Sequence, residues 1–188
     1  MKQKGIKIMM GMVLLTTLSS AGASTQRCRD PARQDKPMQL ATTTANQSAQ
    51  PRFTPLDEQR VLDRQTGLEW QRCSVGLSGA QCQQGRLERY SLPGVMGLMA
   101  RIRRQGWAGH TDWRLPSREE LASLLHPDCV NPAIDTSAFP NTPTSSFWSA
   151  TGQAAAHYYV DFKDGHSEQE DINLANPIRL VRTPESTH

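Results

Sequence analysis

The chain has 188 residues, a length that suits one domain with a hydrophobic core and is short for two. It carries 21 Lys and Arg against 18 Asp and Glu. Three of the lysines and none of the acids lie in the first 23 residues, so the rest of the chain carries 18 residues of each sign. This balance argues against nucleic-acid binding, for which a basic domain with clustered cations is typical.

Residues 1–23 have the pattern of a secretory signal peptide. A basic start is followed by a largely apolar stretch over 8–18, and Ala21-Gly22-Ala23 suits a signal peptidase. We expect cleavage near Ala23 and a mature chain in the periplasm or outside the bacterial cell. A retained signal anchor stays open as the alternative. The apolar stretch is shorter than the roughly 20 residues of a membrane-spanning helix, and no later stretch approaches that length, so we expect no span.

Residues 24–52 are predicted to form a flexible N-terminal arm. They are rich in Thr, Gln, Ala and Asn and hold few large apolar side chains, so little buried surface offsets the entropy of ordering them. Cys28 is the residue that would tie the arm to the domain.

The four cysteines of an exported chain indicate disulfides. They lack the paired Cys-x-x-Cys spacing that favours a zinc site. Three pairings are open, and spacing alone does not choose among them. We favour Cys73 with Cys82, because the flexible VGLSGAQ loop between them closes readily, and this leaves Cys28 with Cys129.

The first globular element is a predicted hairpin. Residues 61–63 and 68–71 read as strands, and Gly67 is placed to take the positive φ that closes the turn. The alternation of side chains then turns Trp70 inward.

Two helices are predicted next. Apolar residues recur at intervals of three and four over 94–105, and Gly106 stops the helix. Further on, Ser117 and Glu120 form a capping box ahead of several leucines, which predicts a second, short helix.

The last part of the chain is predicted to be antiparallel strands after a proline-rich loop that Cys129 would pin. Residues 147–150 and 157–162 read as strands, and Asp164-Gly165 is a two-residue hairpin signal that returns the chain as 166–170. Residues 177–182 read as the final strand.

Four short blocks in fixed order carry a resemblance: TGLEWQRC from Thr66, HTDWRLPSREEL from His110, FWSA from Phe147 and IRLVR from Ile178. Together they resemble the Lcl C-terminal domain family of bacterial envelope proteins. The resemblance covers residues 53–183 and leaves 184–188 as a C-terminal tail. It implies an α+β, C-type-lectin-like mixed fold with two helices and short antiparallel strands, which the two disulfides would staple. The adhesin that names the family binds sulfated glycosaminoglycans, so the resemblance implies adhesion or glycan binding. The collagen-like tract of that adhesin is missing here, which argues against trimers driven by a triple helix.

The candidate ligand-binding residues lie in and just after the one locally basic stretch, 85–105. They are Arg86, Arg89, Arg101, Arg103, Arg104 and Trp107. The planar fork of arginine suits sulfate and carboxylate groups. Trp107, between glycine-flanked positions, is expected to be partly exposed and able to stack on a sugar, whereas Trp70, Trp113 and Trp148 are expected in the core. The alternative stays open that the arginines at 101–104 are solvated charges favoured at a helix C-terminus.

An enzyme is not expected. The sequence holds no G-x-S-x-G elbow, no H-E-x-x-H motif and no phosphate loop, and we expect no cofactor and no metal. Residues 161–171 are an acidic counterpart of the basic stretch, and we expect them to be solvated strand surface in place of a calcium site. Alternatively, the acidic and basic stretches would meet between subunits of a homo-oligomer. The leading hypothesis is an exported binding module for acidic polysaccharide. The alternatives are a subunit of an envelope assembly such as a pilus or secretion apparatus and, most remote, an oxidoreductase using Cys73 and Cys82.

Overall fold

A computed structural model describes residues 25–29 and 50–185 of the protein. The predicted signal peptide and most of the predicted arm and tail lie outside the described residues. The described part is an α+β fold, as the sequence predicts, and every strand pairing in it is antiparallel. None of its helices is long and apolar enough to cross a membrane.

The helices are α1 (Leu92–Gln105) and α2 (Arg118–Ala122). The strands are β1 (Arg27–Cys28), β2 (Phe53–Pro55), β3 (Arg60–Asp63), β4 (Glu69–Gln71), β5 (Leu77–Ser78), β6 (Gln84–Gly85), β7 (Cys129–Val130), β8 (Ser146–Gln153), β9 (Ala156–Asp161), β10 (Gln169–Asp171) and β11 (Val181–Arg182).

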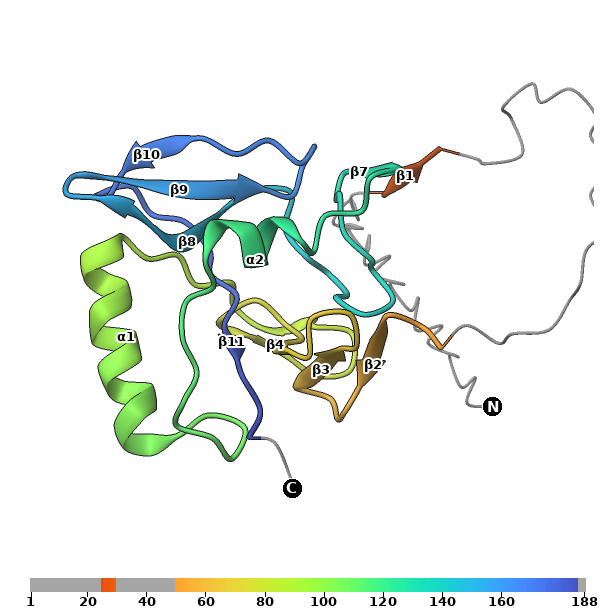
Figure 1. Ribbon diagram of the computed structural model, residues 1–188, viewed down its shortest axis with the longest axis horizontal. Coiled ribbons are helices and arrows are strands. Elements are labelled where there is room, and N and C mark those ends of the chain that lie inside the picture. Colours follow the sequence, from red (N-terminus) through yellow and green to blue (C-terminus); the bar gives the residue numbers. More distant parts are fainter. Residues whose placement is uncertain (1–24, 30–49, 186–188) are drawn as a thin grey trace, which may run out of the picture.

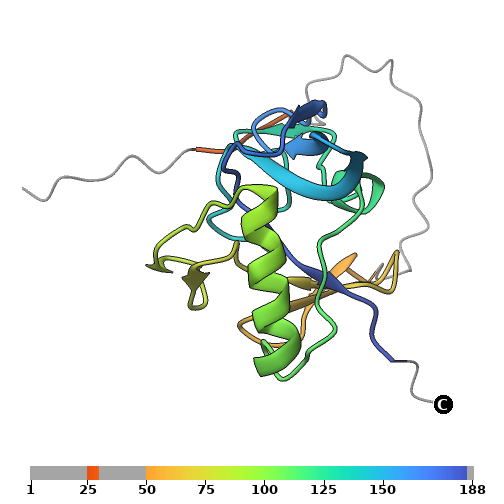
Figure 2. The ribbon, with the colours of Figure 1, turned by 90° about the vertical axis from the view of Figure 1, so that its left-hand side faces the viewer.

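Two larger sheets organise the domain, one in the order β11-β4-β3-β2 and one in the order β10-β9-β8. Figure 1 shows the three-stranded sheet at the top, the four-stranded sheet at the bottom, and α1 alongside them on the left. Turned by 90°, α1 lies in front of the segment that leads to β11 (Figure 2). Two short ribbons, β1-β7 and β5-β6, complete the set of sheets in the described residues.

The predicted hairpin is confirmed. β3 and β4 pair directly, Gly67 takes φ 72°, and Trp70 is fully buried. The buried Asp63 holds the turn, since its carboxylate accepts from the Gln65 N–H and from the Thr66 hydroxyl, at 3.0 and 2.9 Å. Burial raises the pKa of Asp63, but these bonds and the pair with Arg52 outweigh burial, so its pKa ends below the usual value.

Both predicted helices are confirmed. α1 begins at Leu92, two residues earlier than expected, because Pro93 is preorganised for a first helical turn. It ends where Gly106 takes φ 74°, and its buried face is Val95, Leu98, Met99 and Ile102. α2 carries both bonds of the predicted capping box.

The tryptophans Trp70, Trp113 and Trp148 are buried as predicted. The indole N–H of Trp148 donates to the Tyr90 carbonyl at 2.8 Å. The buried Nε1 of Trp70, in contrast, contacts no acceptor among the described residues. The apolar side chains of the core around this ring leave its one polar atom without a hydrogen-bond partner.

Both favoured disulfides are present, Cys73–Cys82 and Cys28–Cys129. The longer bridge joins β1 to β7, where Cys28 and Cys129 are also direct partners in the strand register. The described piece of the arm is therefore held on the domain by a covalent bond as well as by strand pairing.

Two predictions for the last strands need correction. The connection from β9 to β10 covers 162–168, and its innermost backbone bond, from the Asp161 N–H to the His166 carbonyl at 2.7 Å, encloses four residues in place of the predicted two. The Asp161 carboxylate also accepts from the Lys163 N–H, which starts the turn early, and β10 begins only at Gln169. The final strand is shorter than the predicted 177–182 and covers Val181–Arg182.

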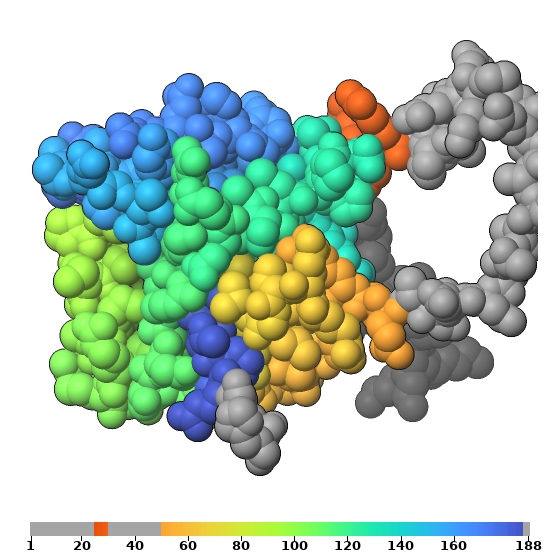
Figure 3. Space-filling view, viewed as in Figure 1, coloured from red at the N-terminus to blue at the C-terminus, as the bar shows by residue number. Residues whose placement is uncertain are grey.

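Residues 176–182, which we call the C-terminal strap, are all buried. The strap runs from the three-stranded sheet to the four-stranded sheet (Figure 1) and bonds to a different partner at each step. The carbonyl of Pro177 accepts from Trp148, that of Ile178 from Val75 and that of Leu180 from Gln71. The strap therefore joins β8, β4 and the loop after β4, which explains why it is not one continuous strand. In Figure 3 only the last described residues, in dark blue, emerge between neighbouring segments.

Arg179 is the buried charge of the strap, with no exposed surface. Its guanidinium donates to the carbonyls of Gln71 and Arg72 and to the Thr142 hydroxyl, and lies 4.8 Å from the ring centre of Phe139. No carboxylate pairs with it among the described residues. Burial lowers the pKa of Arg179 to about 9, so the group still carries its proton at neutral pH.

We predict that Arg179→Lys destabilises the protein by at least about 2 kcal/mol, because one ammonium cannot reach acceptors from two segments and each orphaned acceptor costs about 1–3 kcal/mol. Urea unfolding with the disulfides intact measures the change. The exposed Arg103→Lys is the matched control and should stay within about 0.5 kcal/mol. Equal stability of the two variants would contradict the role given to Arg179.

Candidate functional site

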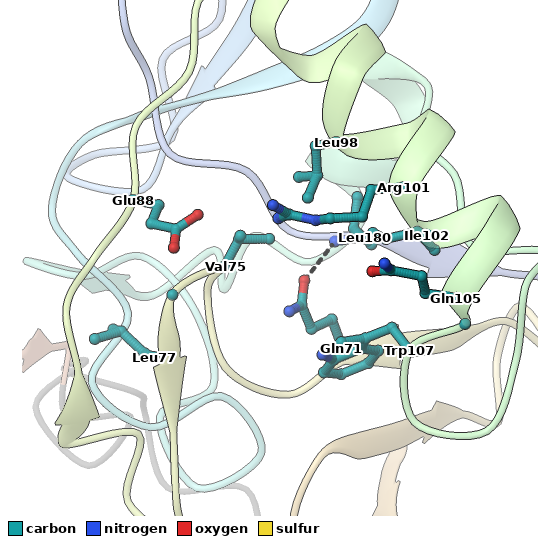
Figure 4. A pocket seen from close by; sticks show the side chains of 12 residues that line it. Gln71, Val75, Leu77, Glu88, Leu98, Arg101, Ile102, Gln105, Trp107 and Leu180 are labelled. Carbon is teal, nitrogen blue, oxygen red and sulfur yellow. Dashed lines mark hydrogen bonds between the residues drawn. The ribbon is translucent and has the colours of Figure 1, made fainter.

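A cleft of about 350 Å³ opens between α1, the β5-β6 ribbon and the end of β4. Figure 4 shows side chains from these separate segments converging on it. The floor is formed by Gln71, Val75 and Leu180. Two of the residues predicted from the sequence as ligand-binding, Arg101 and Trp107, line the cleft.

One wall of the cleft is a face of α1. Leu98, Arg101, Ile102 and Gln105 follow one another at spacings of three, one and three residues, which places them along one side of a helix. Leu98 and Ile102 are buried against the domain, and Arg101 and Gln105 lie on the exposed rim. The amphipathic pattern that packs the helix therefore also sets a guanidinium and an amide at the mouth of the cleft.

Trp107 closes the end of the cleft beside the helix. Residues 107–110 form a tight turn in which Ala108 and Gly109 both have positive φ, and Trp107 and His110 exchange two backbone bonds of 2.7 and 3.0 Å. The ring of Trp107 packs edge-to-face on Trp113, with centres 5.0 Å apart, and its carbonyl accepts from the Trp113 indole. Trp107 is half-buried, as expected, and is held from two sides.

The opposite wall is the β5-β6 ribbon and the segment after it. Gly76 and Gly85 approach so closely that a Cβ on Gly76 would lie 2.1 Å from the Arg86 carbonyl. Both glycines have positive φ, so the ribbon requires glycine at these positions. The Cys73–Cys82 bridge closes the loop that contains β5. This wall brings Leu77 and Glu88 to the cleft.

Gln71 is the polar group on the floor, and its side chain is almost fully buried, with 3% exposed. Its backbone N–H donates to the Leu180 carbonyl at 2.9 Å, and its side-chain Oε1 accepts from the Leu180 N–H at 3.2 Å. Figure 4 shows this bond and the amide nitrogen turned away from it into the cleft. No acceptor within residues 25–29 and 50–185 contacts that Nε2.

The charged groups of the cleft are Arg101 and Glu88. No carboxylate of the described chain lies within ion-pair distance of Arg101. Glu88 accepts a short hydrogen bond from the Tyr90 hydroxyl. Burial and the bond to Glu88 raise the pKa of Tyr90, and Arg101 acts in the opposite direction, so the three groups are neighbours. Arg101 is therefore the cation available to a ligand.

The other arginines predicted as ligand-binding are not brought to this cleft. Arg86 and Arg89 line an adjoining hollow with Tyr90, which shares Glu88 with the cleft, and Arg89 donates to the Ser145 hydroxyl at 3.1 Å. Neither Arg103 nor Arg104 lines the cleft, and Arg103 lies about 200° around the helix from Arg101. The basic stretch of the sequence thus divides into separate surfaces in the fold.

Sequence reasoning missed Gln71, Glu88 and Gln105. Gln71 follows the predicted core residue Trp70, and nothing in its local pattern indicates that its own polar side chain is buried as well. The helical spacing of Gln105 from Arg101 was available as a signal for a shared face.

The acidic residues predicted as a counterpart gather around Tyr159. Burial first, and then Glu168, Glu170, Asp161 and Asp164, raise the pKa of its phenol. Among the described residues no group of three or more His, Cys, Asp or Glu side chains is arranged to hold a metal ion.

The fold and the cleft define a small α+β domain, stapled by two disulfides, with a polar and aromatic cleft at its surface. The family model of the Lcl C-terminal domain matches residues 59–182. The chain therefore belongs to the Lcl C-terminal domain family, as the four sequence blocks indicated. No curated protein matches the chain.

We predict that the four tryptophans differ in their access to solvent, because only Trp107 is not fully buried. Iodide should quench a minor fraction of the fluorescence, helped by its attraction to Arg101. Trp107→Phe should remove that fraction, and Trp113→Phe, the control, should leave it. Quenching that persists in Trp107→Phe would mean that another indole is accessible.

Proposed function

We propose that the protein is an exported, non-enzymatic module that binds an acidic saccharide in the cleft between α1 and the β5-β6 ribbon. The observation that carries the proposal is the meeting of Arg101 and Trp107 in one cleft. An arginine without a carboxylate partner suits a carboxylate or sulfate group, and an indole face suits the apolar face of a sugar ring.

The rigidity of the cleft supports binding. Trp107 is held by its turn and by Trp113, and the floor is tied to the C-terminal strap. Preorganised side chains lose little entropy when a ligand arrives, so a modest number of contacts gives useful affinity. The volume of about 350 Å³ lies at the lower end for small-molecule sites, which suits one or two sugar rings.

The groups that line the cleft favour binding over catalysis. Glu88 is its one carboxylate, and it is engaged by Tyr90. Glycoside hydrolysis in most families needs two carboxyl groups across the scissile bond. Cys73 and Cys82 form a disulfide, which removes the free thiols that the oxidoreductase alternative needs.

The two disulfides also support a location in an oxidising compartment. Together with the signal-like N-terminus, they favour the periplasm or the cell surface. Adhesion to acidic glycans is the role that such a location would allow.

We predict that the mature protein is retained on immobilised heparin or polygalacturonate, and that added salt weakens this retention. Arg101→Ala should weaken binding about tenfold, the effect of losing one charge-assisted hydrogen bond. Arg104→Ala removes the same charge from the same helix outside the cleft and serves as the control. Equal losses in both variants, or none in Arg101→Ala, would contradict binding in the cleft.

A second candidate is a subunit of an envelope assembly. Met96 on the outer face of α1 is 67% exposed, and Leu174 is 49% exposed, so apolar contacts remain for a protein partner. Cross-linking in the native envelope followed by purification tests this candidate. Met96→Lys should abolish a specific cross-linked complex while glycan binding persists, and an unaffected complex would exclude this surface.

A further inference from the structure

We infer that the cleft selects an N-acylated acidic sugar, with its carboxylate on Arg101 and the carbonyl of its acyl amide on Gln71. This inference rests on the proposed function and narrows it to one ligand chemistry. The juxtaposition of a cation without a carboxylate partner, an amide NH₂ group that opens into the cleft and an apolar lining carries it (Figure 4).

The amide of Gln71 is the first argument. The side chain is 3% exposed, its oxygen is used by Leu180, and its nitrogen faces the cleft with no acceptor from the described chain. The nitrogen opens into the cleft, so a ligand that displaces water from it must offer an acceptor at that point. The carbonyl oxygen of an acyl amide is such an acceptor, and it carries no charge that would have to be neutralised on the floor.

The apolar lining beside Gln71 is the second argument. Val75 and Leu98 are 8% and 5% exposed, and Leu77 lies on the wall opposite Leu98. An acyl methyl group fits against such side chains, whereas a hydroxyl or sulfate would be desolvated there without a partner. The floor therefore suits both halves of an acetamido group.

The third argument is that Arg101 and Glu88, which carry opposite charges, both line the cleft without forming an ion pair. A ligand with one carboxylate can sit on Arg101 and remain apart from Glu88. A densely charged ligand such as heparin also gains from Arg101, but it brings further anions close to the Glu88 carboxylate, and this repulsion offsets part of the gain. The cleft thus favours a singly charged sugar ring, which Trp107 can cover with its indole face.

The test uses calorimetric titration of the mature, disulfide-bonded protein with single sugars. N-acetylmuramic acid and N-acetylneuraminic acid carry both groups, glucuronic acid carries the acid alone, and N-acetylglucosamine carries the acetamido group alone. We expect the sugars with both groups to bind about tenfold tighter than either partial ligand. Tighter binding of N-acetylmuramic acid would indicate a cell-wall source, and tighter binding of N-acetylneuraminic acid would indicate a sialylated glycan.

Gln71→Glu isolates the amide, because the new carboxylate still accepts from the Leu180 N–H and cannot donate to the ligand. The added negative charge of Gln71→Glu lowers the affinity of Arg101 for every acidic sugar. The readout is therefore the ratio of the affinity for N-acetylmuramic acid to the affinity for glucuronic acid. This ratio should fall to about one in Gln71→Glu and stay unchanged in Arg104→Ala. In the unaltered protein, the side-chain NH₂ resonances of Gln71 should shift with N-acetylated sugars and stay in place with glucuronic acid.

The outcomes separate the two levels of the proposal. Equal binding of glucuronic acid and N-acetylmuramic acid, or Gln71 resonances that do not move, overturns the inference and leaves acidic-saccharide binding intact. Binding of N-acetylglucosamine as tight as that of the acids overturns the part played by Arg101. Absence of binding for all four sugars, together with no retention on acidic polysaccharide, overturns both.

Discussion

The burial of the C-terminal strap, residues 176–182, is the constraint on which the rest of the fold depends. Its Arg179 guanidinium is a desolvated cation whose cost is offset by carbonyls from the end of β4 and by the hydroxyl of Thr142. A buried charge of this kind is tolerated only where several acceptors are fixed around it. The strap therefore holds together the β4 edge, the loop that carries Thr142 and the three-stranded sheet. Loss of its contact with any one of these segments leaves polar groups without a hydrogen-bond partner.

The same contacts connect the fold to the candidate site. Gln71 is bonded to the strap three times, through its N–H, its carbonyl and its side-chain oxygen. This leaves its amide nitrogen in a fixed direction, facing the cleft between α1 and the β5-β6 ribbon. The ligand site is thus formed by residues distant in sequence, and its polar floor is a by-product of how the last residues of the domain are buried.

What the sequence could predict was mostly local. The turn at Gly67, the end of α1 at Gly106 and the capping box of α2 follow from the preferences of a few adjacent residues, and all three are present. The favoured disulfides followed from one flexible loop and elimination. Arg179 in the IRLVR block gave no sign of being buried, because its acceptors come from residues 71, 72 and 142. The division of the arginines among surfaces likewise depends on helix rotation and on neighbours far along the chain.

Native-state hydrogen exchange of the Gln71 and Leu180 amides tests the central claim most directly. If the strap holds the domain together, both amides exchange only through global unfolding, and their opening free energies equal that of the most protected amides in β4 and β8. A saccharide that binds the cleft then raises their protection by the same factor as the global stability. Exchange of Leu180 through a local opening, with β4 and β8 still protected, would contradict the account.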